Sequence, residues 1–408
     1  MKFGVLADLF DGAGAKFLTR NELKKQHEFQ GVRDLRKLLG EPFEPKTFDT
    51  EYFWLTDDED CEPRTVTSFS TWADVRRKDP LRHGEYRLLY SVESEVVVRE
   101  AAAGDLVLVV LTKQGTLVVV LCPADSTIAR QILWLFGLSP EAGRADVKAL
   151  KPDEGAPLGF AARAILDALG IELEEPEPDS FGRLLDLYGL NFPRTVDFSE
   201  FARSTCDDAD PVAAPDQALI AWMDHEEALF RHLEKHIVAE RLEQGFMLAA
   251  GPDVDGFISF SLSVQNRRKS RAGWAFGHHV AAVLGAHGLC YKREATTEKR
   301  NGPDFLFPGE TEYHDDSFDV ARLSMLAAKT SCKDRWRQVL AEANRIGEKH
   351  LLTLQPGISP GQTKEMQAER LQLVVPRPIF ASYTGDQQAW LLDVRGFLDL
   401  VKERQARS

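Results

Sequence analysis

Three residues whose types and spacing suit phosphodiester chemistry lie in the last third of this 408-residue chain. Asp304 follows Gly302-Pro303 and opens a short apolar stretch, Lys329 lies 25 positions later, and Glu342 lies another 13 positions on. Carboxylates are the hard oxygen ligands that Mg²⁺ prefers, and a bound Mg²⁺ polarises a scissile phosphate and activates water. A lysine beside them would orient that water and stabilise the developing negative charge. Asp304, Lys329 and Glu342 are therefore candidate catalytic residues, with Asp304 and Glu342 as the Mg²⁺ ligands.

The Asp304 and Lys329 pair also has an ordinary structural interpretation. A Pro-Asp pair followed by a lysine is common by chance. Asp304 would then cap a turn, and Lys329 would extend its aliphatic stem over apolar surface from the end of a strand. The spacing alone leaves both interpretations open.

Lys333, Asp334 and Arg335 follow Lys329 and have the side chains that can read G·C base pairs. Lysine or arginine donates hydrogen bonds to guanine O6 and N7, and aspartate accepts one from cytosine N4. The alternative is an ordinary helix N-terminus with an acid in its first turn.

Positive charge is concentrated in one part of an otherwise acidic chain. The formal net charge is −14, yet residues 256–350 contain 15 lysines and arginines against 11 acids. That segment therefore carries +4 and the rest of the chain carries −18. A basic cluster on an acidic protein indicates a local polyanion site or, alternatively, a solvated face that contacts nothing. The candidate DNA contacts in this cluster are Arg267, Arg268, Lys269 and Arg271.

The pattern of the second half predicts an α/β domain that would bring the candidate catalytic residues together. Apolar strands alternate with amphipathic helices, as in buried sheets covered by helices. Strand ends would carry Asp304 and Lys329, and the helix after the second strand would present Glu342. We expect helices over 216–244, 274–287 and 333–346, a basic turn over 266–273, and strands over 304–307, 325–330, 350–354 and 371–375.

The first half reads mostly as β-structure. Strands rich in valine, leucine and aromatic residues are expected over 51–55, 85–90, 105–112 and 116–122, the last two joined by a hairpin at Lys113-Gln114-Gly115. A helix over 125–136 follows. The boundaries predicted from composition are an N-terminal domain over 1–137, a proline-rich linker over 138–179 with one short helix near 161–169, and a C-terminal domain over 180–408.

Composition excludes several classes of protein. The length fits two or three domains, and the longest apolar runs are far too short for a membrane helix. Five scattered cysteines, without a CxxC pair, predict neither a disulfide framework nor a zinc site. The N-terminus has no secretory pattern, so we expect a cytoplasmic protein without membrane partners.

Four segments closely resemble the catalytic domain of EcoRII-type type II restriction endonucleases. They are Asn266 to Gly273 (NRRKSRAG), Pro303 to Pro308 (PDFLFP), Tyr313-His314-Asp315, and Leu326 to Gln338. The resemblance extends from about Phe181 to Leu400 and implies a restriction-endonuclease-like (PD-(D/E)xK) fold. It also implies that Ala327 replaces the usual acid two residues before the lysine, and that Glu342 supplies this acid instead.

The same resemblance implies the roles of the candidate residues. Asp304 and Glu342 would hold Mg²⁺ and Lys329 would serve the attacking water. Lys333, Asp334 and Arg335 would read the G·C pairs of a CC…GG type site in double-stranded DNA.

The chain departs from that family at Gly277, where some members have a further acid on a helix. His278 and His279 follow, but adjacent histidines point to different sides of a helix and make a poor metal pair. Glu226 aligns with a family acid and would help to position a carboxylate or, alternatively, be a solvated helical glutamate.

The N-terminal half resembles, more weakly, the B3-like DNA-binding barrel that EcoRII-type enzymes carry as an effector module. The resemblance rests on the β-rich content, on the segment from Lys16 to Gly31 and on the strand GEYRLLY. It implies a second DNA reader that blocks the catalytic cleft until it binds its own site. The candidate contacts, each of which could equally be surface charge without a ligand, are Arg76, Arg77, Lys78, Arg82 and Arg87.

The sequence therefore predicts a Mg²⁺-dependent type II restriction endonuclease, homodimeric because a palindromic site matches a two-fold symmetric protein. Two alternatives stay open: a DNA-binding protein with a degenerate nuclease site, and a nuclease that depends on DNA modification.

Overall fold

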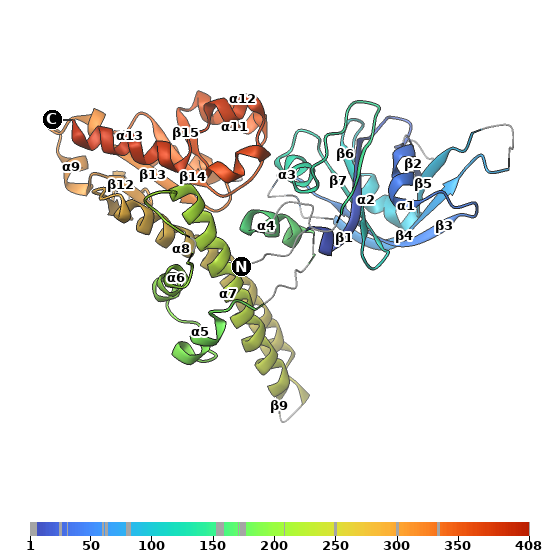
Figure 1. Ribbon diagram of the computed structural model, residues 1–408, viewed down its shortest axis with the longest axis horizontal. Coiled ribbons are helices and arrows are strands. Elements are labelled where there is room, and N and C mark those ends of the chain that lie inside the picture. The colour runs from blue at the N-terminus through green and yellow to red at the C-terminus, as the bar shows by residue number, and fades with distance from the viewer. Residues whose placement is uncertain are drawn as a thin grey trace. The chain divides into compact units, whose positions relative to one another are not determined.

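The computed structural model describes residues 6–23, 27–30, 32–58, 61, 64–78, 83–151, 159–169, 171, 177–207, 209–248, 251–298, 302–332 and 335–407. The chain divides into two compact units. The N-terminal unit contains residues 2–173 with 356–361, and the C-terminal unit contains residues 174–355 with 362–408 (Figure 1).

An eight-stranded sheet forms the N-terminal unit, in the order β2-β5-β4-β3-β7-β6-β1-β8. Neighbouring strands are antiparallel except β3 and β7, which are parallel. The strands are β1 (Phe10–Phe17), β2 (Glu28–Phe29), β3 (Lys46–Trp54), β4 (Arg64–Asp74), β5 (Tyr86–Tyr90), β6 (Leu106–Thr112), β7 (Leu117–Cys122) and β8 (Asp146–Ala149). Because β2 and β8 end this order without pairing to each other, the described sheet is open, and the B3-like barrel stays a prediction.

Both faces of this sheet are covered, which explains the unbroken apolar runs of β6 and β7. Successive side chains of a strand point to opposite faces. Leu108 and Val120 lie in one core cluster, whereas Val109 and Val119 lie in another. The helices of this unit are α1 (Arg36–Leu39), α2 (Glu95–Val98), α3 (Thr127–Phe136) and α4 (Phe160–Ala168).

The four strands expected in the first half, the hairpin at Gly115 and the helices near 125–136 and 161–169 are confirmed. The segment expected to be a linker contains one strand that was not expected, β8, which pairs with β1. The domain boundaries themselves stay a prediction.

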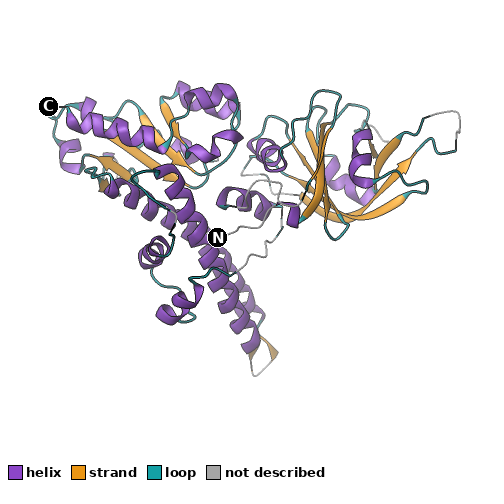
Figure 2. Ribbon diagram, viewed as in Figure 1, coloured by secondary structure: helices purple, strands orange, loops and turns teal. Residues whose placement is uncertain are grey.

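Two long helices dominate the C-terminal unit. They lie side by side and extend from the sheet to a small hairpin at their far end (Figures 1 and 2). They are α7 (Pro215–Gln244) and α8 (Val254–Ala286), preceded by α5 (Phe181–Tyr188) and α6 (Thr195–Ser204), and joined by β9 (Met247–Leu248) and β10 (Gly251–Pro252). Apolar side chains of α5, α6 and α7, among them Phe181, Phe198 and Phe230, form a core between these helices.

A five-stranded mixed sheet follows, in the order β11-β12-β13-β14-β15. The first three strands are antiparallel neighbours, and β13, β14 and β15 are parallel. The strands are β11 (Lys292–Arg293), β12 (Phe305–Phe307), β13 (Ser324–Lys329), β14 (Lys349–Thr353) and β15 (Leu371–Val374); the helices are α9 (Glu310–His314), α10 (Trp336–Val339), α11 (Pro360–Ala368), α12 (Gly385–Trp390) and α13 (Val394–Ala406).

Two expectations about this unit are wrong. The basic run over 266–273 is not a turn, because it lies inside the 33-residue helix α8. The helix expected over 333–346 is only the four-residue α10, after which the chain turns. Ala343, directly after Glu342, has a φ of 47°, which no α-helix allows.

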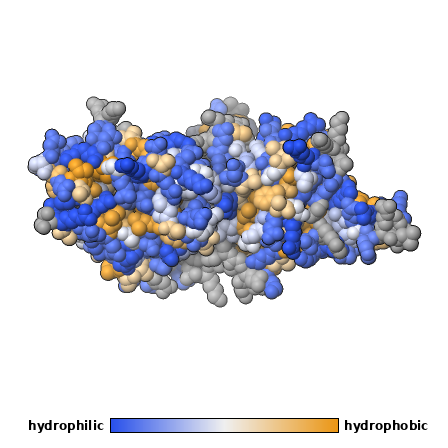
Figure 3. All heavy atoms as spheres, turned by 90° about the horizontal axis from the view of Figure 1, so that it is seen from above, coloured by the Kyte–Doolittle hydropathy of each residue, from blue (hydrophilic) through white to orange (hydrophobic). Residues whose placement is uncertain are grey.

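The surface agrees with the charged composition. Hydrophilic residues cover most of the visible face in the space-filling view, with apolar residues in scattered patches (Figure 3). Within the described parts of the chain, no helix combines the length and the apolar character needed to cross a membrane.

Candidate active site

Asp304 and Lys329 are brought together at adjoining ends of β12 and β13. The antiparallel register pairs Phe305 with Leu326, so Asp304 stands beside the last residues of β13. One carboxylate oxygen of Asp304, Oδ2, accepts hydrogen bonds from the backbone N–H of Ala328 at 2.7 Å and from Lys329 Nζ at 2.9 Å. The fold therefore brings Asp304 and Lys329 into contact, as the spacing predicts.

Glycine is required just before Asp304. A Cβ on Gly302 would lie 1.9 Å from the backbone oxygen of Ala295, so any side chain there would displace the backbone. The backbone N–H of Glu294 then donates to the Asp304 carbonyl oxygen at 3.1 Å. These contacts fix where the chain enters β12 and hence where the Asp304 carboxylate lies.

Glu342 reaches the same site from the turn after α10. Burial raises the pKa of Glu342 to about 7, and the negative charge of Asp304 acts in the same direction, whereas Lys329 and Lys349 oppose it. Its Oε2 atom is buried and has no hydrogen-bond partner among the described residues. Glu342 is thus a desolvated carboxylate with one oxygen available to a ligand.

The turn that carries Glu342 is held by neighbouring side chains. The backbone N–H of Asn344 donates to Glu298 Oε2 at 3.2 Å, and that of Ala343 donates to Thr297 Oγ1 at 3.4 Å. Glu298 also accepts a hydrogen bond from the Tyr313 hydroxyl at 2.6 Å, which in turn accepts one from the backbone N–H of Arg345 at 3.2 Å. A positive φ at alanine costs energy and persists only where surrounding contacts enforce it, as these do at Ala343.

Lys349 is a second lysine near Glu342. It is buried at the start of β14, and its Nζ donates to the carbonyl oxygen of Leu340. Burial lowers the pKa of Lys349, and Glu342 and Glu298 oppose that effect. Sequence reasoning missed Glu298 and Lys349, because nothing in their spacing marks them; they enter the site through the turn and the strand that follows it.

The residues present fit a Mg²⁺ ion. The Asp304 and Glu342 carboxylates are close enough for the charge of Asp304 to raise the pKa of Glu342. Mg²⁺ in phosphoryl-transfer sites is commonly held by one or two carboxylates together with waters and substrate phosphate. The unpartnered Oε2 of Glu342 is the kind of buried oxygen that such an ion satisfies. Across the described part of the chain, no group of three or more His, Cys, Asp or Glu side chains could hold a metal.

Of the expected base readers, only Arg335 is described. Its side chain is exposed at the start of α10, and it forms no ion pair with a described residue. Lys333 and Asp334 lie outside the described residues.

Three residues of the basic cluster of α8, Arg267, Arg268 and Arg271, contact acidic or aromatic side chains of this unit. Arg271 is buried, pairs with Glu226 at 3.0 Å, and lies 3.8 Å from the centre of the Phe198 ring. Arg268 pairs with Glu234 at 2.5 Å, and Arg267 lies over the ring of Phe192 at 4.4 Å. The side chain of Lys269 lies outside the described residues. Arg271 is therefore held inside the protein, away from any surface that could contact DNA.

The interpretation of Glu226 as a solvated residue is wrong. Glu226 is 2% exposed and lies between Arg271 and His279, whose Nε2 is 3.0 Å from Glu226 Oε2. Although burial opposes it, His279 and Arg271 lower the pKa of Glu226, so the carboxylate is charged. Glu226 thus stabilises the packing of α7 against α8.

His278 and His279 use their ring nitrogens in hydrogen bonds rather than as a metal pair. Arg203 Nη1 donates to His279 Nδ1 at 3.3 Å, and Arg293 Nη1 donates to His278 Nδ1 at 3.1 Å. Gly277 has no side chain, and a Cβ there would lie 3.2 Å from Arg293 Nη2. The side chain nearest to Gly277 is therefore that of Arg293.

The arginines expected to bind DNA in the N-terminal unit are partly neutralised. Arg76 forms an ion pair with Glu85, and Arg87 pairs with both Glu28 and Glu85. Arg77 and Lys78 lie in the turn after β4, with Lys78 exposed. Arg82 lies outside the described residues.

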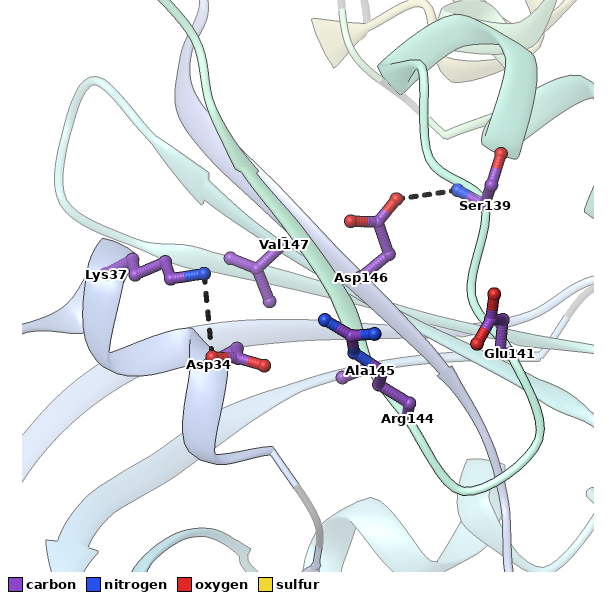
Figure 4. Close-up of a pocket in the computed structure, with 8 residues that line it drawn as sticks. All are labelled: Asp34, Lys37, Ser139, Glu141, Arg144, Ala145, Asp146 and Val147. Atoms are coloured by element: carbon purple, nitrogen blue, oxygen red, sulfur yellow. Dashed lines mark hydrogen bonds and ion pairs between the residues drawn. The ribbon is translucent and has the colours of Figure 1, made fainter.

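A polar hollow of about 260 Å³ also lies in the N-terminal unit, between α1 and the segment that leads into β8 (Figure 4). Lys37 and Arg144 line it together with Asp34, Glu141 and Asp146. Three carboxylates against two cations do not suit a phosphate, and Asp304, Lys329 and Glu342 lie in the other unit. The hollow is therefore not the candidate active site.

A mixed sheet with a carboxylate and a lysine at adjoining strand ends, and a second carboxylate close by, characterises the restriction-endonuclease-like class of domain. Residues 230–398 match the family of EcoRII C-terminal domains. The type II restriction enzyme EcoRII of Escherichia coli is 37% identical to this chain over 230 residues, which make up 56% of this chain and 55% of that enzyme. The chain thus spans about half the length of this relative. The resemblance to the EcoRII catalytic domain is confirmed.

Two solved structures show a more distant similarity. Metal-depleted Ecl18kI in complex with uncleaved DNA is 20% identical, with a TM-score of 0.43 over 56% of this chain and 85% of that chain. A complex of the restriction endonuclease PspGI with substrate DNA is 14% identical, with a TM-score of 0.43 over 52% of this chain and 93% of that chain.

Proposed function

We propose that this protein is a type II restriction endonuclease that hydrolyses double-stranded DNA with Mg²⁺ at a short CC…GG type site. The observation that carries the proposal is the convergence of Asp304, Lys329 and Glu342 inside the part of the chain that matches the EcoRII C-terminal family. A cytoplasmic location and a homodimer go with this function, because DNA is the substrate and a palindromic site matches two-fold symmetry.

The chain's own residues have distinct parts in the reaction. Asp304 and Glu342 would hold the ion, which when bound polarises the scissile phosphate and lowers the pKa of a water molecule. Lys329, now donating to Asp304 Oδ2, would turn its ammonium group toward the attacking water and the phosphate oxygens. In hydrolysis the attacking water gives up a proton as its oxygen bonds to phosphorus, the P–O bond to the leaving strand breaks, and the leaving oxygen takes up a proton.

Lys333, Asp334 and Arg335 would supply base recognition beside the catalytic lysine. The N-terminal unit would act as a B3-like effector domain that inhibits the catalytic unit until it binds its own DNA site. Arg77 and Lys78 are its best candidate contacts, because Arg76 and Arg87 already have acidic partners.

The test is digestion of unmethylated plasmid DNA with several CCNGG sites, with and without Mg²⁺, followed by sequencing of the ends. We expect discrete ends that require Mg²⁺ and share one sequence. Specific binding without cutting would instead support a DNA-binding protein with a degenerate nuclease site, for which the absence of an acid at Gly277 is the motivating observation. Cutting of modified DNA alone would support a modification-dependent nuclease.

A further inference from the structure

Arg293 is a cation that no acidic side chain among the described residues pairs with. It lies in β11, partly exposed, and its guanidinium lies 5.6 Å from the centre of the Phe305 ring. Its Nη1 donates to His278 Nδ1 at 3.1 Å, and none of the described carboxylates forms an ion pair with it. Two other arginines of this unit, Arg268 and Arg271, instead pair with Glu234 and Glu226.

His278 holds Arg293 without cancelling its charge. The second ring nitrogen, Nε2, lies 3.2 Å from Thr195 Oγ1, so both ring nitrogens are engaged. The ring of Trp274, one helical turn earlier, stacks on the His278 imidazole, with 6.3 Å between the two ring centres. Burial and the adjacent Arg293 charge lower the pKa of His278 to about 4, so at neutral pH the imidazole is an uncharged acceptor. The guanidinium therefore keeps a defined position and its full positive charge.

Gly277 lies beside the other end of this guanidinium, so close that a side chain there would crowd Nη2. The nearest atom to a Cβ built on Gly277 would be Arg293 Nη2, at 3.2 Å. Arginine has five N–H donors, and a planar guanidinium with free donors suits a phosphate, which it can bind in bidentate fashion. The position thus has the charge and the donors that an oxyanion needs.

The backbone of Arg293 adjoins the strand that begins at Asp304. Arg293 pairs with Phe305, and the next residue, Glu294, donates its N–H to the Asp304 carbonyl oxygen. Each DNA strand carries a phosphate about every 3.4 Å along the helix axis. Because β11 is the strand next to β12, a duplex whose scissile phosphate lies at Asp304 would pass beside the Arg293 backbone.

We propose that Arg293, positioned by His278 beside Gly277, binds a DNA backbone phosphate next to the scissile one. This inference rests on the proposed nuclease function. Arg293 would contribute affinity rather than sequence preference, because phosphate contacts do not distinguish bases.

The first test measures binding of the full-length protein, without metal so that the DNA stays intact, to a CCNGG duplex and to a random duplex over a range of salt. Each phosphate contact contributes about 0.9 to the slope of log K against log salt. For Arg293→Gln we expect a slope smaller by about 0.9 and the same fold-loss of affinity on both duplexes. Arg407→Gln is the matched control, since it removes one positive charge from an exposed pair with Glu403. Its slope should equal that of the wild type.

A second variant tests the same site without removing the arginine. Gly277→Asp would set a carboxylate beside Arg293 Nη2, and pairing would withdraw the guanidinium from DNA. We expect weaker binding and a smaller slope, whereas Gly277→Ala, which adds a methyl group but no charge, should weaken binding much less and leave the slope unchanged. If the missing acid instead limits catalysis, Gly277→Asp would bind normally and cut faster in Mg²⁺, which would overturn the proposal.

The positioning role of His278 has its own readout. His278→Leu removes the acceptor for Arg293 and should lower affinity as Arg293→Gln does, while His278→Asn, which keeps an acceptor oxygen, should restore part of it. Adding His278→Leu to Arg293→Gln should cost little more, because both act on one contact.

Failure of this inference differs from failure of the proposed function. An unchanged salt slope in Arg293→Gln, with thermal unfolding like the wild type and wild-type cleavage at CCNGG sites, would overturn the inference alone. A wild-type protein that neither binds nor cuts DNA would overturn both.

Discussion

At the scale of single residues, the site depends on the Asp304 carboxylate, which binds a backbone N–H and a lysine at once. Asp304 Oδ2 accepts from both a backbone N–H and the Lys329 ammonium, so the lysine has a defined position before any substrate arrives. Glu342 contributes the opposite property, a buried carboxylate oxygen without a partner. The first arrangement orients the lysine, and the second leaves coordination capacity for a cation.

Lys329→Ala should abolish cleavage and retain specific DNA binding, because it removes the group that orients water while leaving the Ala328 contact to Asp304. Cleavage on CCNGG plasmid and gel-shift affinity are the two measurements. Lys364→Ala, an exposed lysine on α11, is the control. Preserved cleavage in Lys329→Ala would remove Lys329 from the chemistry.

Arg335→Ala should weaken binding to the specific site by about 1–3 kcal/mol, as expected for loss of a bidentate contact to guanine. Affinity for random DNA should change much less. An equal loss on both duplexes would make Arg335 a phosphate contact instead, and no loss on either would exclude it from the interface.

At the scale of elements, α7 and α8 are joined by charges inside their interface. Glu226 on α7 meets Arg271 and His279 on α8, all three of them nearly inaccessible. Burying charges costs free energy, and such a group is stable only with its partners present. The α7–α8 pair therefore has a fixed alignment, and with it the Gly277–His278 segment that faces Arg293.

Glu226→Ala should destabilise the C-terminal unit by about 3–5 kcal/mol, because it leaves the Arg271 charge buried without compensation. Denaturant unfolding of full-length protein is the measurement. Glu403→Ala, which breaks the exposed pair with Arg407, should cost less than about 1 kcal/mol. Equal effects of the two substitutions would show that the buried pair has no special role.

At the scale of the whole molecule, the candidate catalytic residues and the expected regulatory domain lie in different units. Asp304, Lys329 and Glu342, and the strands and turn that hold them, belong to the C-terminal unit. The open eight-stranded sheet of the N-terminal unit has two covered faces and its own core clusters. Each unit has the core that an independently folding domain needs.

Removing the residues up to about Gly170 should leave a nuclease that cuts at least as fast as the full chain, because every candidate catalytic residue remains. Cleavage rates on a plasmid with one CCNGG site compare the two proteins. A soluble, folded fragment that cuts more slowly than the full chain would contradict inhibition by the N-terminal unit.

Local residue patterns were enough to predict several strands and helices. The runs over 105–112 and 116–122 are apolar throughout because both faces of their sheet are buried, and this pattern marks them as strands. The strands that begin near residues 304 and 325 likewise place Asp304 and Lys329 at adjoining strand ends. The resemblance to EcoRII-type enzymes could also be seen in the sequence, because it lies in short contiguous segments of the C-terminal half. Tertiary contacts decided the rest.

Only the folded chain shows that Glu342 lies on a turn held by Glu298 and Tyr313, because the length of α10 depends on contacts with distant segments. Arg271 is buried because it packs against Phe198 and pairs with Glu226. The sequence does not show whether an arginine on a helix faces water or a buried acid. Arg293 and Gly277 are 16 positions apart. Their meeting depends on α8 packing against the sheet, an interaction that no local pattern encodes.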